Sequence, residues 1–333
     1  MDAGARARRL YAQSIVWDAH SCLPIDPAID VGVLERHRKA GIDYVSINVG
    51  MDFNPWTQCV RTLAGFRAWL QAHPEGYVLV DTVADVRRAK RERKLAVAFD
   101  LEGSDMLDGD LAMLRLYRDL GVRQIHFAYN RDNKVAGGVH GADIGLTPWG
   151  RRLVEEVNRV GMIMDCSHTG HRSSLDIMAA SAKPVVFSHA CVAALQAHPR
   201  NVQDDQIDAC AATGGVVGIT GIGVFLGANR TETDLVLRHV DYVAERVGVA
   251  HVGLGLDFEF LPHLPDPKPE GFVAGDWWPK EHYSGLGLGP TRFVQPEQLP
   301  EIAEGLVKRG YGDGDVAAIL GGNFLRVAEA TWL

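Results

Sequence analysis

Val185-Val186-Phe187-Ser188-His189-Ala190-Cys191 is an apolar run of strand length that carries a histidine near its end, a pattern typical of a buried strand. A second run of the same kind, Met162-Ile163-Met164-Asp165-Cys166-Ser167-His168, stops on another Ser-His pair. Residues 169–184 between them have room for one helix and two short loops, so we expect two adjacent parallel strands. Both imidazoles would then lie at one carboxyl edge of a sheet or barrel. Neutral imidazole is a common metal ligand, so this edge is a candidate metal site; two hydrogen-bonded histidines are the alternative.

Apolar runs of strand length recur along the whole chain, and nearly all of them precede a predicted helix. Eight such runs are predicted, at residues 14–20, 44–49, 95–101, 123–128, 162–168, 185–191, 215–220 and 252–256. The alternation of strand and helix predicts an α/β fold with a parallel sheet, and eight units predict a closed (β/α)8 TIM barrel. We predict a single domain over residues 1–333, with an irregular segment at about 261–295 and C-terminal helices packed on the barrel.

The net charge, the apolar runs and the cysteines argue against several classes of protein. The formal net charge of −8 argues against a nucleic-acid surface, so no nucleic-acid partner is expected. The N-terminus lacks the apolar core of a secretory signal, and no apolar run approaches the roughly 18 residues of a membrane span. The 5 cysteines, at positions 22, 59, 166, 191 and 210, are scattered and odd in number, which suits reduced thiols. We therefore expect a cytoplasmic protein without a membrane partner.

Polar side chains stand where the predicted strands end, which is where (β/α)8 barrels carry their chemistry. These strand-end residues are His20, Glu102, Tyr129, His168, His189 and Asp257. Buried charged groups are costly unless they are paired or bind a metal, so the set favours a site for zinc or a similar divalent ion. One carboxylate can bridge two ions, and a water between them becomes a strong nucleophile. Asp257 is a candidate to exchange the proton of this water, and Arg200 offers a planar fork for a substrate carboxylate.

Five short motifs follow one another along the chain. They are Asp165-Cys166-Ser167-His168-Thr169, Phe187-Ser188-His189, Arg200-Asn201-Val202, Gly253-Leu254-Gly255-Leu256-Asp257-Phe258 and Gly322-Asn323-Phe324-Leu325-Arg326-Val327. In this combination the chain resembles the membrane (renal-type) dipeptidases, the M19 metallopeptidases of the amidohydrolase superfamily. The resemblance implies a (β/α)8 barrel with a binuclear zinc site that hydrolyses dipeptides by a metal-bound hydroxide, often with a D-residue at the C-terminal position. A homodimer is implied by the resemblance alone.

The resemblance also implies roles for individual residues. Glu102, in Leu101-Glu102-Gly103, would bridge the two metals. His168 and His189 would complete the ligands of one metal, and His20 would bind the other. Asp257 would act on the water between them.

Two positions depart from the family's pattern. The family has His-x-Asp where this chain has His20-Ser21-Cys22, so one metal has a thiolate as its second ligand or lacks that ligand. We therefore expect two zinc ions per chain if Cys22 is a ligand, and one if its side chain only packs. Tyr129 stands where mammalian members have a histidine that stabilises the tetrahedral intermediate, and a phenol can donate one hydrogen bond to an oxyanion.

The resemblance also implies that Arg200 would bind the carboxylate of the substrate.

Three functions stay open at the level of sequence. The first is zinc-dependent hydrolysis of dipeptides, in which Arg200 fixes the free C-terminus. The second keeps the fold and the metal but acts on another small amide or lactam, because Cys22 and Tyr129 alter the site. The third is a catalytically silent barrel. Eight other histidines lack a consistent position at a strand end, and most of them are expected at the surface or in loops. Among these eight, His140 in the glycine-rich loop is the one that could still belong to a site. The eight are His126, His140, His171, His198, His239, His251, His263 and His282.

Overall fold

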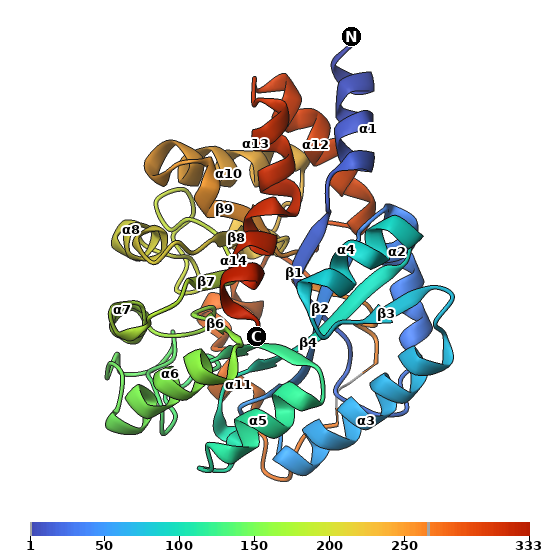
Figure 1. The fold of residues 1–333 in the computed structure, drawn as a ribbon. Helices are drawn as coiled ribbons and strands as arrows, with labels where there is room; N and C mark the ends of the chain where they lie inside the picture. Colours follow the sequence, from blue (N-terminus) through green and yellow to red (C-terminus); the bar gives the residue numbers. More distant parts are fainter. Residues whose placement is uncertain (1, 265–266) are drawn as a thin grey trace.

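A parallel β-sheet forms the centre of the protein in this computed structural model, which describes residues 2–264 and 267–333 (Figure 1). The strands are β1 (Trp17–Cys22), β2 (Tyr44–Met51), β4 (Leu95–Glu102), β5 (Val122–His126), β6 (Ile163–Asp165), β7 (Val185–Ala190), β8 (Val217–Ile219), β9 (Val252–Leu254) and β10 (Phe258–Glu259). The order of these strands along the chain is also their order in the sheet, except that the last one, β10, lies beside β1. Each hydrogen-bonded pair is parallel. The carboxyl ends of the strands therefore meet at one rim.

Residues 252–259 close the sheet into a barrel. β9 pairs with β8, and β10 pairs with β1 at the other edge of the sheet. Between the two strands, Asp257 N donates a hydrogen bond to His20 O at 2.8 Å. When β9 and β10 are counted as two parts of one strand, the described ranges contain eight barrel strands, so the predicted (β/α)8 barrel is confirmed. The sequence did not predict β3 (Tyr77–Leu79), which pairs with β4 beside the barrel.

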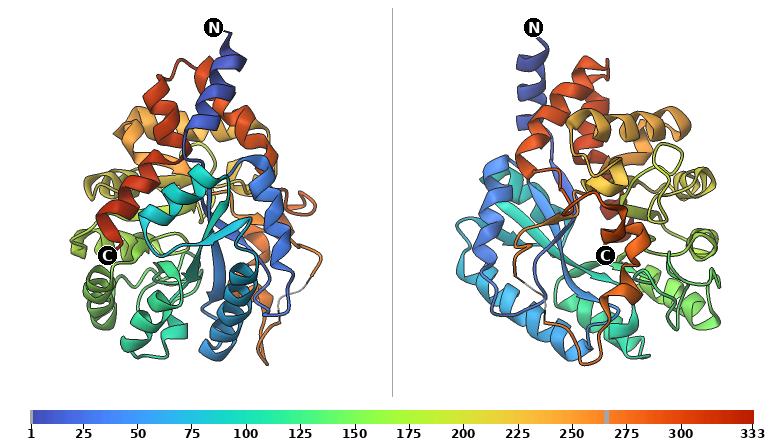
Figure 2. Two further views of the ribbon diagram at one scale, coloured as in Figure 1. Left: turned by 45° about the vertical axis from the view of Figure 1, so that its right-hand side comes forward. Right: turned by 180° about the vertical axis from the view of Figure 1, so that it is seen from behind.

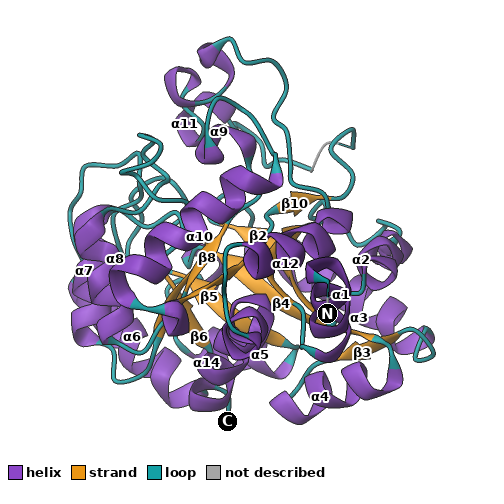
Figure 3. Ribbon diagram, turned by 90° about the horizontal axis from the view of Figure 1, so that it is seen from above, coloured by secondary structure: helices purple, strands orange, loops and turns teal. Residues whose placement is uncertain are grey.

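Helices surround the strands, as the view from above shows (Figure 3). The helices between barrel strands include α2 (Glu35–Ala40), α3 (Trp56–Ala72), α4 (Val83–Glu92), α5 (Ala112–Asp119), α6 (Pro148–Val160), α7 (His171–Ala180), α8 (Asp204–Ala212) and α10 (Thr233–Val247). In α6, Thr147 Oγ1 accepts a hydrogen bond from Gly150 N at 3.0 Å, and Pro148 occupies the first turn. Gly161 ends the helix with a φ of 82°, which favours glycine. These signals are local, so the sequence predicts this helix at its observed position.

The C-terminal helix α14 (Asn323–Thr331) closes the amino end of the barrel. Trp17 and Tyr44, at the first positions of β1 and β2, stack with ring centroids 3.6 Å apart. Phe324 of α14 stacks on Trp17 at 6.3 Å, and all three side chains are buried. Because aromatic side chains fill this end, the open site lies at the carboxyl rim.

The N-terminal helix α1 (Ala3–Gln13) packs beside α12 (Leu299–Lys308) and α13 (Asp313–Ala317), as both further views show (Figure 2). Arg6 and Arg9 form ion pairs with Asp313 at 2.6 and 2.9 Å. Within the described ranges, no helix combines the length and the apolar character needed to cross a bilayer.

Residues 267–293, which we call the cover segment, lie over part of the carboxyl rim. They contain only short helical elements such as α11 (Ala274–Trp277); residues 265 and 266, which belong to the predicted irregular segment, lie outside the described residues. Phe53, in the loop after β2, contacts the rings of Phe272, Trp277 and Trp278 at centroid distances of 4.8, 5.1 and 5.8 Å. These ring contacts hold the cover segment against the barrel.

Candidate metal centre

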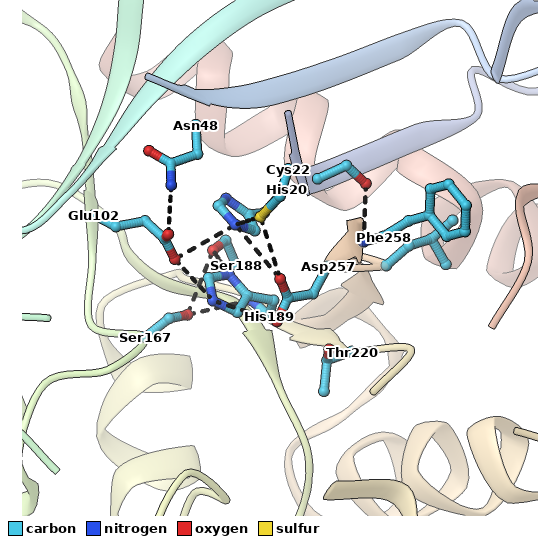
Figure 4. Close-up of polar contacts among 12 residues, drawn as sticks. His20, Cys22, Asn48, Glu102, Ser167, Ser188, His189, Thr220, Asp257 and Phe258 are labelled. Carbon is cyan, nitrogen blue, oxygen red and sulfur yellow. Dashed lines mark hydrogen bonds and ion pairs between the residues drawn. The ribbon is translucent and has the colours of Figure 1, made fainter. Parts of the chain in front are cut away.

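The predicted metal ligands and the predicted catalytic residue Asp257 converge at the carboxyl rim, although they lie far apart in the sequence. The close-up shows His20 and Cys22 of β1, Glu102 at the end of β4, His189 of β7 and Asp257 between β9 and β10 directed toward one another (Figure 4). His168, which follows β6, approaches the same centre. The exposed fraction is 0% for His20 and His189 and 3% for Glu102. The rim therefore holds a largely buried cluster of side chains of the kinds that can bind a metal, and whether they do so stays a prediction.

One group of ligand atoms consists of His168, His189 and Glu102. The two Nε2 atoms lie 2.9 Å apart. Glu102 Oε1 is 3.0 Å from His168 Nε2 and 3.6 Å from His189 Nε2. Two nitrogen ligands bound tetrahedrally to one zinc ion lie about 3.4 Å apart, so these spacings fit a divalent ion with small adjustments.

A second group consists of His20, Cys22 and Asp257. Cys22 Sγ lies 3.3 Å from His20 Nε2 and 3.6 Å from Asp257 Oδ1. His20 Nε2 is also 3.4 Å from Glu102 Oε1. The same carboxylate oxygen thus faces both groups, so Glu102 is the side chain that would be shared between two ions.

Hydrogen bonds at the far side of each ring direct the Nε2 atoms into the cluster. Nδ1 of His20 lies 3.1 Å from Asp100 Oδ1, and Nδ1 of His168 lies 2.8 Å from Asn130 Oδ1. Nδ1 of His189 lies 2.7 Å from Ser188 Oγ, and Asn48 Nδ2 donates to Glu102 Oε2 at 2.6 Å (Figure 4). Metal-binding histidines commonly have such partners, because the partner fixes the tautomer that leaves Nε2 free. None of these supporting roles was predicted from the sequence.

The pKa shifts of the two strand-end histidines suit metal ligands. Burial, helped by the Arg200 charge, holds the pKa of His168 well below its ordinary value. Burial, helped by His20, does the same to the pKa of His189. Both rings are therefore neutral imidazoles, the form that binds a metal. Burial also raises the pKa of Glu102 to about 7, and a nearby divalent cation would favour its anionic form.

Left-handed backbone occurs at three site residues that are not glycine. The φ angles are 65° for His168, 53° for Asp257 and 59° for Asn130. Such conformations cost on the order of 1 kcal/mol or more each and concentrate at functional sites. They turn the chain sharply just beyond the strands and direct these side chains inward.

His126 was wrongly predicted as a surface or loop histidine. The structure buries it completely at the end of β5, with Nε2 2.7 Å from Asp165 Oδ2 and its ring centroid 5.4 Å from that of His189. His20, Glu102, His126 and His189 form a group whose ligand atoms all lie within 4.8 Å of one another. The alternation along β5, with Gln124 and His126 on one face, could have shown this inward direction.

A cavity of about 430 Å³ opens onto the cluster. Its polar lining includes Cys22, Glu102, His168 and Asp257 together with the two predicted substrate residues, Tyr129 and Arg200. Tyr129 stacks on the His168 ring at 4.2 Å, and Arg200 Nη2 lies 3.1 Å from His168 Nε2. The rest of the wall is largely apolar and includes Leu23, Met51, Ile222, Phe225, Trp278 and Phe293. The structure thus brings every predicted site residue to one cavity or directly behind it, and their individual roles stay predictions.

The fold and the cluster define a (β/α)8-barrel protein with a candidate binuclear metal centre. The chain belongs to the membrane dipeptidase family (peptidase family M19), whose model matches residues 4–268. Dipeptidase verJ of Clonostachys rogersoniana is 32% identical over 259 residues, which are 76% of this chain and 59% of that protein. Dipeptidase tcpJ of Claviceps purpurea is 32% identical over 248 residues, 73% of this chain and 52% of that protein. The chain therefore spans only about half to three fifths of the length of these curated relatives.

Solved structures share the fold over almost the whole chain. An amidohydrolase from Pseudomonas aeruginosa is 26% identical with a TM-score of 0.86, and the match covers 98% of this chain and 99% of that one. A metallopeptidase from Rhodobacter sphaeroides, solved with a phosphinate mimic of the dipeptide L-Ala-D-Ala, is 21% identical with a TM-score of 0.76. That match covers 96% of this chain and 100% of the other. At this identity the second likeness supports the fold alone.

Proposed function

We propose that this chain is a metal-dependent dipeptidase that hydrolyses the peptide bond of small dipeptides, including L,D-dipeptides. The observation that carries the proposal is the convergence of two ligand groups, joined by Glu102, on the wall of one cavity that also holds Arg200. Membership of the dipeptidase family and the curated relatives named as dipeptidases support the same activity.

Zinc is the ion that the donor set fits best, because histidine nitrogen, carboxylate oxygen and thiolate sulfur are its usual ligands. His168, His189 and Glu102 would hold one ion, while His20, Cys22 and the shared Glu102 would hold the second. Two zinc ions supply a Lewis acid for the peptide carbonyl and lower the pKa of a water molecule.

The chain's own residues then bind the substrate and move the proton. Arg200 binds the free carboxylate of the dipeptide, which excludes longer peptides at that end. Tyr129 donates a hydrogen bond from its phenol to the carbonyl oxygen as negative charge develops there. Asp257, with Oδ1 3.6 Å from Cys22 Sγ and Oδ2 4.0 Å from His189 Nε2, accepts a proton and returns it to the leaving amine.

A substrate screen with metal control tests this proposal. The purified protein is assayed with L,L-dipeptides, L,D-dipeptides and cyclic amides, before and after removal of metal by a chelator. We expect dipeptide hydrolysis that disappears with the metal and returns with added zinc. Asp257→Asn is expected to lower kcat by about 10²–10⁴-fold while the bound metal stays. Unchanged turnover after complete metal removal would rule out the proposal, and turnover of cyclic amides alone would move it to another substrate class.

A further inference from the structure

The cover segment contributes a phenol to the wall of the cavity. Tyr283 follows the helical turn Lys280–His282 and lines the cavity of about 430 Å³ together with Arg200 and Phe225. Its hydroxyl oxygen lies 3.1 Å from Nε2 of His140 in the glycine-rich loop. Tyr283 is therefore a polar group that a distant segment of the chain brings to the substrate side of the barrel.

His198 connects this tyrosine to the loop that carries Arg200. Arg200 N donates a hydrogen bond to His198 Nδ1 at 3.1 Å, so Nδ1 is the unprotonated nitrogen of that ring. His198 Nε2 then carries the proton and donates it to the carbonyl oxygen of His282 at 2.9 Å. Burial lowers the pKa of His198 to about 4, which agrees with this neutral tautomer. One imidazole thus joins the backbone of Arg200 to the residue that precedes Tyr283.

The ring of Tyr283 is confined on several sides. It makes edge contacts with the rings of His140, His198 and Phe225, at centroid distances of 5.7, 5.5 and 6.2 Å. The His140 ring also stacks on His282 at 5.3 Å with an interplanar angle of 7°. These contacts leave the phenol little rotational freedom, so its position relative to Arg200 is set before a substrate arrives.

One of the two hydrogen-bonding states of the Tyr283–His140 pair leaves the phenol as a donor for a ligand. Burial raises the pKa of Tyr283 above its ordinary value against the opposing effect of the Arg200 charge, so the phenol keeps its proton at neutral pH. Burial lowers the pKa of His140 to about 3, so this ring is neutral. When His140 donates from Nε2 to the phenol oxygen, the phenol proton is free to point into the cavity.

We infer that Tyr283 is a second ligand of the substrate's free carboxylate, acting beside Arg200; the inference rests on the proposed function. A carboxylate accepts several hydrogen bonds, and a hydrogen bond from a neutral phenol to this charged group is of the strong, charge-assisted kind. Arg200 Nη2 lies 3.3 Å from the carbonyl oxygen of His189, so part of the hydrogen-bonding capacity of the guanidinium is used within the protein. The phenol of Tyr283 would supply a further donor to the substrate carboxylate. Tyr283 is thus a specificity-determining residue, because it favours substrates with a free C-terminus.

Tyr283→Phe tests the inference, since it removes one oxygen atom and keeps the ring. The best dipeptide of the screen and its C-terminal amide are compared by steady-state kinetics in the wild type and the variant. We expect KM for the dipeptide to rise about tenfold with kcat changed less than about twofold. KM for the amide should stay the same, because the amide lacks the charged acceptor. Tyr242→Phe is the matched control, since that hydroxyl donates to Asp204 at 2.8 Å on the outer helices and should leave both constants unchanged.

Failure of the inference and failure of the proposed function give different results. An unchanged KM for the dipeptide in Tyr283→Phe, or an equal rise for dipeptide and amide, overturns the role of Tyr283 while hydrolysis persists. If the wild type hydrolyses no dipeptide, the proposed function fails. Calorimetric titration of the zinc-loaded protein with L-alanyl-L-leucine then decides the inference. Weaker binding by Tyr283→Phe supports it, and equal or absent binding overturns it.

Discussion

Replacing Cys22 with alanine is expected to remove one of two zinc ions from the protein. Cys22 Sγ lies 3.3 Å from His20 Nε2, so the two atoms can face a common ion. Without the sulfur, this ion keeps only His20 and the shared carboxylate of Glu102. Loss of a residue that only supports a ligand costs about 10–100-fold in metal affinity. Loss of a direct ligand should cost at least about 100-fold, or roughly 2.7 kcal/mol.

The assay counts ions and identifies the sulfur ligand. Elemental analysis after dialysis should find two zinc ions per chain in the wild type and one in Cys22→Ala. The cobalt-loaded wild type should show sulfur-to-cobalt charge-transfer absorption. Cys22→Asp should retain two ions without this absorption, because a carboxylate replaces the thiolate. Cys59→Ala is the matched control, since Cys59 is buried in α3 and does not line the cavity.

The number of protons released when zinc binds tests independently whether the Cys22 sulfur is a ligand. Burial raises the pKa of Cys22 well above its ordinary value even though His20 opposes this, so the thiol is protonated before an ion binds. Zinc binding to the wild type should therefore release about one more proton per chain than binding to Cys22→Asp. Calorimetry in two buffers of different ionisation enthalpy measures this difference. Equal ion counts in the wild type and Cys22→Ala, with no sulfur absorption, would refute the reasoning.

Three further predictions follow from the fold and the cavity. Arg200→Met should raise KM for dipeptides about 100-fold but affect dipeptide amides much less; equal losses for both would contradict its carboxylate role. Asp165→Asn should destabilise the protein by about 3–5 kcal/mol, because it breaks the buried pair with His126. The pKa of Asp165 is lowered to about 2 because His126 and hydrogen bonds outweigh burial. This stabilisation is therefore present above pH about 4 and lost as the pH falls toward 2, so urea unfolding should show variant and wild type converging there. Thr147→Ala should lower the free energy of unfolding by about 1 kcal/mol without changing KM, and an unchanged urea midpoint would contradict the capping role of Thr147.

The positions of the ligands along the chain could be predicted because they depend on local sequence. His168 and His189 each follow an apolar run, and such runs become strands wherever both faces of a parallel sheet are covered. Polar residues at the ends of those runs then lie at the carboxyl rim of any barrel that the strands form. The alternation of strands and helices therefore predicted both the fold and most of the candidate metal ligands.

The features that were not predicted from the sequence owe their positions to contacts between segments that lie far apart in the chain. Asp100 lies 80 residues from the His20 ring that it contacts, and the direction of its side chain depends on the pairing of β1, β2 and β4. The alternation along β5 directs His126 inward, but its complete burial depends on the neighbouring strands and could not be predicted from that strand alone. The short strand β3 was missed because its stability comes from pairing with β4 rather than from its own three residues.

The sequence alone determined the strand–helix order and the kinds of donor atom at the rim, because spacing, caps and polarity are properties of short segments. Three features could be known only from the folded protein: Glu102 Oε1 faces both ligand groups, residues 252–259 close the barrel, and Tyr283 lines the same cavity as Arg200. These features arise from strand register and from the packing of the cover segment. Both depend on contacts between residues far apart in the chain, which no local pattern specifies.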